Sequence, residues 1–204
     1  MFEYPPTTHQ RRHGPQGYND PRSFKPWLRD EFAFRCVYCL WRETWCVDGD
    51  GRFSVEHLKS QSRHPDLIRE YDNLAYACCG CNSAKQDREA PVAVDDAPLA
   101  AHLKVQPDGR VAAKTAEGEQ LIELCLLNRP AMVNARQTVS QLWELLNVTS
   151  TPEANDLKHR LFGFPSDLPN LARLHPPGGN TKPEGIASSH FERRQRGELP
   201  YLWS

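Results

Sequence analysis

The sequence predicts an α+β fold in three parts: a small zinc-knuckle core, an N-terminal arm, and a mostly helical C-terminal extension. Three observations support this. Two C-x-x-C pairs occur in the first half of the chain, apolar residues recur at helical spacing after residue 116, and the first 25 residues are rich in Pro, Gly, His and Arg. We place the boundaries at 1–33 (arm and short helix), 34–90 (core) and 91–204 (extension).

Composition and charge limit the classes of partner. The 204 residues include 25 Lys and Arg and 26 Asp and Glu, which gives a net charge of -1. A nucleic-acid partner must therefore be argued from local basic patches. No apolar run approaches the roughly 18 residues of a membrane helix, and residues 1–20 lack the apolar core of a signal peptide. We expect a cytoplasmic protein with reduced thiols and no membrane partner.

The secondary-structure elements of the core are predicted from turn and cap residues and from the spacing of apolar residues. Residues 23–36 predict a short helix that Ser23 caps and that leads into the first cysteine pair. Residues 34–45 predict a knuckle followed by a strand, 47–52 a turn with two glycines, and 52–58 a second strand, so that the two strands form a hairpin. A polar loop follows, then the second cysteine pair and a helix that starts near Asn82.

The extension predicts a second, separate set of elements. Residues 90–100 indicate a linker, and 102–115 a hairpin with a Pro-Asp-Gly turn. Residues 117–128 and 130–147 have helical periodicity and are broken at 128–130. Residues 151–164 predict a third helix, with Thr151 as cap and Pro152 in its first turn. Residues 165–185 are irregular, and 188–203 predict a short helix and an aromatic anchor.

The two C-x-x-C pairs indicate a metal site. Zinc binds four thiolates tetrahedrally, and a two-residue spacer lets one turn supply two of them. Thirty-eight residues separate the pairs, so other structure must fold between them. Such a closed site would be structural. The alternative is two unrelated pairs or a redox motif. The predicted ligands are Cys36, Cys39, Cys78 and Cys81.

Three further cysteines complete the count of seven. Cys79 competes with Cys78 as a ligand, but the two-residue spacing to Cys81 favours Cys78. Cys46 and Cys125 have no partner pattern, and we interpret both as buried structural thiols.

Several polar residues lie around the cysteine pairs in a fixed order: Glu56-His57, Asn73-Leu74, Asn82 and Lys85. Each alone is a weak signal, because a lone His is usually a surface or packing residue and an Asn before Leu is usually a turn or cap. Together with the four cysteines, they resemble the HNH endonuclease family, in the subtype with a four-cysteine zinc site and the ββα-metal fold. The resemblance covers about residues 34–88.

The resemblance implies a role for each residue. His57 would be the general base that activates water, since its unperturbed pKa near 6.5 leaves neutral imidazole at pH 7. Glu56 and Asn82 would hold one divalent cation, Mg²⁺ or Mn²⁺, through oxygen ligands. Asn73 would brace the loop and orient His57, and Lys85 would contact a phosphate. A zinc ion at the cysteines would be structural.

Two positions depart from the commonest family pattern. The acidic position is Glu56 where Asp is commoner, and the last position is Asn82 where the family name implies His. Neighbours on a strand point to opposite faces, so a bend or bulge is needed for Glu56 and His57 to reach one site. His64 is a rival base, but its place before Pro65 in a polar loop favours His57.

Basic residues beside the predicted site suggest contacts to nucleic acid, which we expect to be DNA. They are Lys59, Arg63 and Arg88, in addition to Lys85. Other basic clusters lie in the arm (Arg11, Arg12, Arg22, Lys25, Arg29) and near the end (Arg193, Arg194, Arg196).

Two alternatives to a nuclease remain open. One is a zinc-stabilised nucleic-acid-binding module that does not cut. The other is an effector subunit that is activated by a partner protein or works as a homo-oligomer. Family-level analogy suggests restriction or phage defence.

Overall fold

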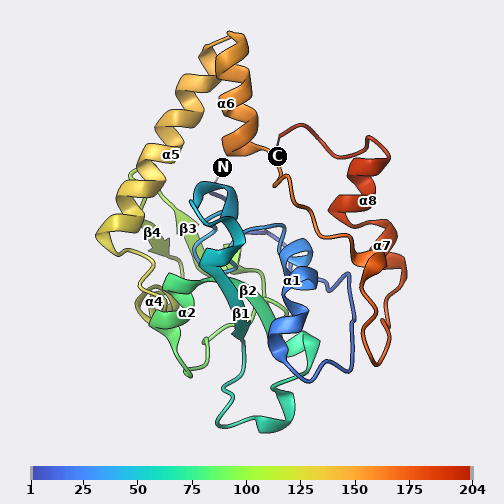
Figure 1. Ribbon diagram of the computed structural model, residues 1–204. Coiled ribbons are helices and arrows are strands. Elements are labelled where there is room, and N and C mark those ends of the chain that lie inside the picture. Colours follow the sequence, from blue (N-terminus) through green and yellow to red (C-terminus); the bar gives the residue numbers. More distant parts are fainter. Residues whose placement is uncertain (1, 203–204) are drawn as a thin grey trace.

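A two-stranded antiparallel sheet and one helix form the centre of the molecule (Figure 1). The structure is a computed structural model that describes residues 2–202. Strand β1 (Phe53–His57) pairs with β2 (Leu74–Cys78), and α2 (Cys79–Lys85) follows β2 directly and packs on the sheet. All five residues of β2 are buried, as a continuous apolar run predicts for a strand covered on both faces. The phenyl ring of Phe53 stacks on Tyr76 across the pair, with ring centroids 4.8 Å apart.

The hairpin predicted within residues 34–58 is wrong. Residues 34–45 contain only an isolated bridge between Arg35 and Arg42 and a 3₁₀ helix, Glu43–Trp45. The predicted turn forms a second 3₁₀ helix, Gly49–Arg52. Strand β1 instead finds its partner beyond the long 58–73 loop, because the apolar run 74–78 can be buried on both faces. Helix α2 also begins at Cys79, three residues before the predicted start.

Helix α1 (Lys25–Glu31) precedes the sheet in the chain and packs against both of its strands. A 3₁₀ helix, Pro21–Phe24, leads into α1. Asp20 caps this 3₁₀ helix, since its carboxylate accepts from the backbone N–H of Arg22 at 2.9 Å. The predicted cap, Ser23, lies inside the 3₁₀ helix, and α1 itself begins without a side-chain cap. Trp27 and Leu28 are completely buried and pack in the core with the sheet residues.

Two buried carboxylates at the end of α1, Asp30 and Glu31, bind segments from near both ends of the chain. Asp30 accepts hydrogen bonds from the His13 ring and from the backbone N–H and ring of His190, each at 2.8 Å. Glu31 accepts from the backbone N–H groups of Arg12 at 2.8 Å and His13 at 3.0 Å. The N-terminal segment is therefore extended but packed. Helices α7 (Glu184–Ala187) and α8 (His190–Gln195) lie on the same side of the molecule as α1 (Figure 1).

The C-terminal extension is mostly helical, as predicted. Helix α3 (Leu99–His102) precedes the hairpin of β3 (Leu103–Val105) and β4 (Val111–Ala113), and three helices follow. These are α4 (Ala116–Leu124), α5 (Pro130–Val148) and α6 (Pro152–Phe162). Thr151 caps α6 as predicted, with its hydroxyl 3.1 Å from the backbone N of Ala154. The α+β class is confirmed.

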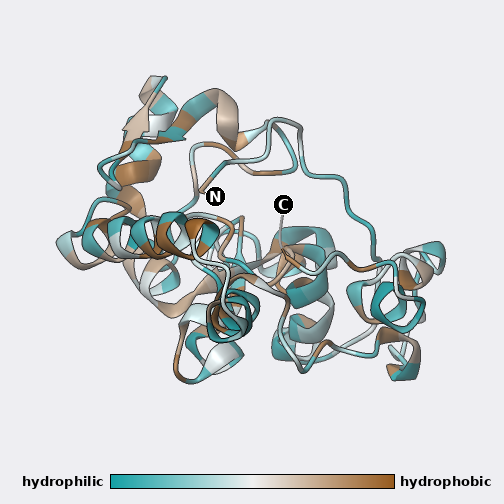
Figure 2. Ribbon diagram, turned by 90° about the horizontal axis from the view of Figure 1, so that it is seen from above, coloured by the Kyte–Doolittle hydropathy of each residue, from teal (hydrophilic) through white to brown (hydrophobic). Residues whose placement is uncertain are grey.

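Helices α5 and α6 project from the body as an antiparallel pair (Figure 1). The helices show hydrophilic and hydrophobic segments in alternation (Figure 2). Trp143 of α5 packs edge-on against Phe162, with ring centroids 4.9 Å apart, while Leu145 and Val148 are exposed. Much of the apolar face of α5 is therefore used for packing within the chain.

The predicted aromatic anchor near the C-terminus is only partly described. Tyr201 is exposed and stacks on the His159 ring at 4.2 Å, and Trp203 lies outside the described residues. Within residues 2–202, no helix combines the length and apolar character needed to cross a membrane.

Candidate functional site

The four predicted zinc ligands form one buried cluster. The Sγ atoms of Cys36, Cys39, Cys78 and Cys81 all lie within 4.8 Å of one another, and those of Cys39 and Cys78 are 3.6 Å apart. A tetrahedral zinc site with bonds of about 2.3 Å places its sulfurs about 3.8 Å apart. The donor set and its spacing therefore fit zinc. Among residues 2–202, it is the one group of three or more His, Cys, Asp or Glu side chains arranged to hold a metal ion.

The chain brings the two pairs together through backbone contacts. The first pair lies in a tight loop in which Leu40 has a positive φ of 62° and its N–H donates to the Cys36 carbonyl at 3.0 Å. The N–H of Val37 donates to the Tyr76 carbonyl at 2.9 Å and joins this loop to β2. Cys78 ends β2, and Cys81 lies in the first turn of α2.

The choice of Cys78 over Cys79 agrees with the structure, because Cys79 is exposed and lies outside the cluster. Cys125 is fully buried, as predicted, whereas Cys46 is only half-buried. Burial raises the pKa of the Cys36 and Cys39 thiols, so a bound cation is needed to keep them as thiolates.

Glu56 is buried beneath α2. Its Oε1 atom lies 2.6 Å from the Lys85 ammonium and 3.4 Å from the Tyr38 hydroxyl, and its Oε2 atom is buried without a hydrogen-bond partner. Burial is the main cause that raises the pKa of this carboxyl to about 7, and Lys85 opposes the shift. One oxygen of the predicted metal ligand thus has no hydrogen-bond partner but is shielded from solvent, and the other pairs with the Lys85 ammonium.

Asn82 faces the same side of β1. Its Nδ2 atom donates to the Ser54 hydroxyl at 2.7 Å and weakly to the Val55 carbonyl at 3.4 Å. This arrangement fixes which end of the amide carries the nitrogen and leaves Oδ1 as the atom able to bind a cation. Asn82 pairs with Ser54 and Lys85 with Glu56, so α2 runs along the strand face that bears residues 54 and 56.

His57 ends β1 and is half-buried. Its Nε2 atom lies 3.0 Å from the Ile68 carbonyl. A carbonyl only accepts, so Nε2 carries the proton and the neutral ring keeps its lone pair at Nδ1. Burial lowers the pKa of His57, and the Ile68 carbonyl opposes this shift. The ring is therefore neutral at pH 7, the form that a general base requires.

The bend expected between Glu56 and His57 is absent from the strand pairing. The register runs without a bulge from Phe53 opposite Cys78 to His57 opposite Leu74. The two side chains accordingly go to different partners: Glu56 to α2, and His57 to the 58–73 loop. Because His57 is the last residue of the strand, its ring lies at the edge of the sheet.

Asn73 braces the 58–73 loop. Its Oδ1 accepts from the backbone N–H of Lys59 at 2.8 Å, and its Nδ2 donates to the Leu67 carbonyl at 3.1 Å. The next residue, Ile68, accepts the hydrogen bond of the His57 ring. The role of Asn73 in orienting His57 stays a prediction.

Asp87 also holds this loop, and sequence reasoning did not single it out. Its carboxylate accepts from the Ser60 hydroxyl at 3.0 Å and from the backbone N–H of Gln61 at 2.8 Å. Ser54 and Tyr38 were missed as well. Ser54 could have been found, because it is two residues from Glu56 and therefore on the same strand face.

The predicted phosphate-binding residues have different surroundings. Lys59, Arg63 and Arg88 are exposed, whereas Lys85 is buried in its pair with Glu56. The Arg88 side chain donates to the Lys85 carbonyl at 3.1 Å and so satisfies the end of α2. The rival base, His64, lies 3.2 Å from a Glu89 carboxylate oxygen, so its ring is engaged by an acid.

Glu56 and Asn82 offer oxygen atoms, which are the ligands that a hard divalent cation prefers. Mg²⁺ is usually held by one or two carboxylates and keeps several waters for the substrate to replace. The unpartnered, buried Oε2 of Glu56 and the Oδ1 of Asn82 are donors of this kind.

A two-stranded antiparallel sheet, a helix that follows it and a buried four-cysteine cluster define a small zinc-knuckle ββα unit. Residues 36–88 of this unit match the family model described as HNH endonuclease, and they make up about a quarter of the chain. No curated protein matches the chain. The family resemblance seen in the sequence is thus confirmed over this segment.

Proposed function

We propose that the protein is a metal-dependent endonuclease that hydrolyses phosphodiester bonds of nucleic acid, with DNA as the expected substrate. The observation that carries this proposal is His57, a neutral imidazole at the end of β1 whose protonated Nε2 is held by the Ile68 carbonyl. It lies in the segment that matches HNH endonucleases. It directly follows Glu56, an acid with one buried oxygen that has no hydrogen-bond partner, although the two side chains leave the strand toward different partners.

In the proposed reaction, His57 Nδ1 takes a proton from the water that attacks the phosphorus. The Ile68 carbonyl fixes the His57 ring through Nε2, and Asn73 fixes the loop that carries Ile68. Glu56 and Asn82 would hold a divalent cation, Mg²⁺ or Mn²⁺. Such a cation, when bound, stabilises charge on the phosphate and on the departing oxygen. Lys59, Arg63 and Arg88 supply exposed positive charge for the nucleic-acid backbone.

The test is cleavage of a supercoiled plasmid at low salt with Mg²⁺ or Mn²⁺. The wild type, His57→Ala and the matched control His64→Ala are compared after zinc content has been measured in all three. We expect His57→Ala to lose about 10²–10⁴-fold in rate and His64→Ala to remain near the wild type. A zinc-loaded His57→Ala protein that cleaves like the wild type would refute the assignment of the base.

A second candidate function is supported by the buried Glu56–Lys85 pair, since an acid that is neutralised internally is less available to a metal. In that case the protein is a zinc-stabilised module that binds nucleic acid without cutting. Retained DNA binding with no cleavage of DNA or RNA under any divalent cation would favour it. Activity that appears only with an added partner would favour an effector subunit.

A further inference from the structure

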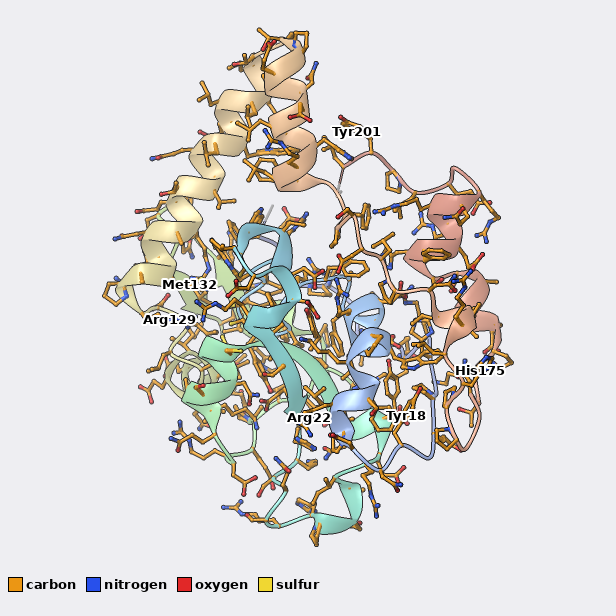
Figure 3. The ribbon with its side chains drawn as sticks, viewed as in Figure 1. Tyr18, Arg22, Arg129, Met132, His175 and Tyr201 are labelled. Atoms are coloured by element: carbon orange, nitrogen blue, oxygen red, sulfur yellow. The ribbon has the colours of Figure 1, made fainter. Side chains whose placement is uncertain are left out.

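Arg129 connects the C-terminal extension to the cysteine cluster. It immediately precedes α5 and lies outside the segment that matches the HNH family. Figure 3 shows Arg129 at the base of α5, on the side of the molecule where α2 lies. Its Nη1 atom is 3.9 Å from the Sγ of Cys81, 3.4 Å from the Cys125 carbonyl and 3.1 Å from the Leu126 carbonyl. The two carbonyls hold the guanidinium against the sulfur.

Gly80 provides the room for this contact. A Cβ atom at position 80 would lie 2.9 Å from Nη2 of Arg129 and 3.5 Å from its Cζ. The glycine is not required for its backbone angles, because it is not among the residues with a positive φ. The absence of a side chain within the second C-x-x-C pair therefore allows the guanidinium to lie against the knuckle.

The charge of the cluster explains why a guanidinium would be useful here. Zinc with four thiolates carries a formal charge of about -2, and the four cysteines are buried, with Cys78 the most exposed at 6%. A buried charge is costly unless it is paired and hydrogen-bonded. The Arg129 side chain supplies one positive charge and an N–H donor to the Cys81 sulfur. A hydrogen-bonded thiolate is also a poorer target for protons and competing chelators.

We propose that Arg129 is an outer-shell donor of the zinc site, which neutralises part of the thiolate charge and retains the metal. The proposal depends on zinc in the cysteine cluster and is independent of nuclease activity. It makes the base of α5 part of the metal site, so zinc retention and the docking of α5 stabilise each other. Outer-shell partners of this kind typically change metal affinity by about 10–100-fold.

The test measures the rate at which zinc leaves the folded full-length protein for an excess of a chromogenic chelator. Arg129→Gln is compared with the wild type and with Arg110→Gln, which removes the same charge from an exposed position at the β3–β4 turn. We expect Arg129→Gln to release zinc at least about tenfold faster and Arg110→Gln to match the wild type. Equal release from all three proteins would overturn the proposal, as would purified protein that binds no zinc.

Gly80→Ala gives a second test that keeps Arg129 and its charge. The added methyl group would displace the guanidinium from the knuckle, so this variant should also release zinc faster. In the double variant Gly80→Ala/Arg129→Gln, the methyl group should add little to the effect of Arg129→Gln alone. Wild-type release from Gly80→Ala, or full additivity in the double variant, would show that the contact does not retain the metal.

Discussion

The ammonium of Lys85 lies 2.6 Å from Oε1 of Glu56, and each side chain is only 1% exposed. The same ammonium donates to the His57 carbonyl at 2.9 Å. This pair joins α2 to β1 in the interior of the unit. The residue expected to contact a phosphate therefore neutralises the residue expected to hold a metal, and a phosphate contact by Lys85 would require the pair to open.

Removing one partner of this pair should destabilise the fold. We expect Lys85→Met to lower the free energy of unfolding by about 1–3 kcal/mol, because the Glu56 carboxyl loses its partner while it stays buried. Without Lys85, the pKa of Glu56, which burial already raises to about 7, rises further, so the carboxyl takes up a proton instead of remaining a buried charge. The measurement is urea denaturation of the zinc-loaded protein. Lys59→Met, at an exposed position, should cost less than about 0.5 kcal/mol. The double variant Glu56→Gln/Lys85→Met should recover part of the loss, and equal costs for the two single Lys variants would contradict the buried pair.

Asn73→Ala should loosen the loop that holds His57. The substitution leaves the Lys59 N–H and the Leu67 carbonyl without their side-chain partner, a loss of about 1–3 kcal/mol. If the proposed mechanism is correct, cleavage should fall while zinc content stays the same. Asn155→Ala, on the exposed face of α6, is the matched control. Unchanged cleavage by a stable Asn73→Ala protein would remove Asn73 from the positioning role.

The neighbouring thiols Cys78 and Cys79 should differ sharply in metal binding. Cys78→Ser should lower the zinc content per chain and destabilise the unit, because one of four buried ligands is lost. Cys79→Ser should bind a full equivalent, since this side chain is exposed and lies outside the cluster. Atomic absorption of the two purified variants measures the difference directly. Loss of zinc from Cys79→Ser would mean that the ligand was assigned to the wrong cysteine.

Glu31 should contribute to stability above acidic pH. Burial by itself raises the pKa of this carboxyl, but the His9 ring, the Arg12 N–H and nearby positive charges outweigh burial and lower the pKa to about 2. A carboxyl whose pKa is depressed on folding stabilises the protein above its unfolded value, near 4.5, and this share is lost as the pH falls toward 2.

We therefore expect the unfolding free energy of the wild type to fall more steeply between pH 5 and 3 than that of Glu31→Gln. Glu119→Gln, at an exposed position, should keep the wild-type slope. The proteins share the same cysteines, so the loss of zinc in acid affects all of them. Parallel curves for Glu31→Gln and the wild type would exclude the proposed contribution.

The sequence predicted the features that depend on local spacing. The C-x-x-C pairs identified the four clustered thiols, and helical periodicity located α4, α5 and α6 together with the Thr151 cap. These features depend on residues a few positions apart, so periodicity and capping rules apply directly.

The features that depend on distant residues were mostly missed. The pairing of β1 with β2 spans the 58–73 loop, and a plausible turn nearer in sequence suggested a different hairpin. Burial of Lys85 depends on where Glu56 points once the sheet has formed. Arg129 reaches the knuckle only because α4 and α5 fold back onto it. Neither contact has a signature in the local sequence.

The hydrogen bonds at Asp30 set an order for the completion of the fold during synthesis. The buried carboxylate takes partners from residues 12 and 13, which emerge before it, and from His190, which is made 160 residues later. A nascent chain that ends before His190 lacks the backbone N–H and the ring that pair with Oδ1 of Asp30, near the C-terminal end of α1. We therefore expect α1 to reach its final hydrogen-bonding state only after α8 has been made. Truncations before α8 should therefore resemble arrested nascent chains.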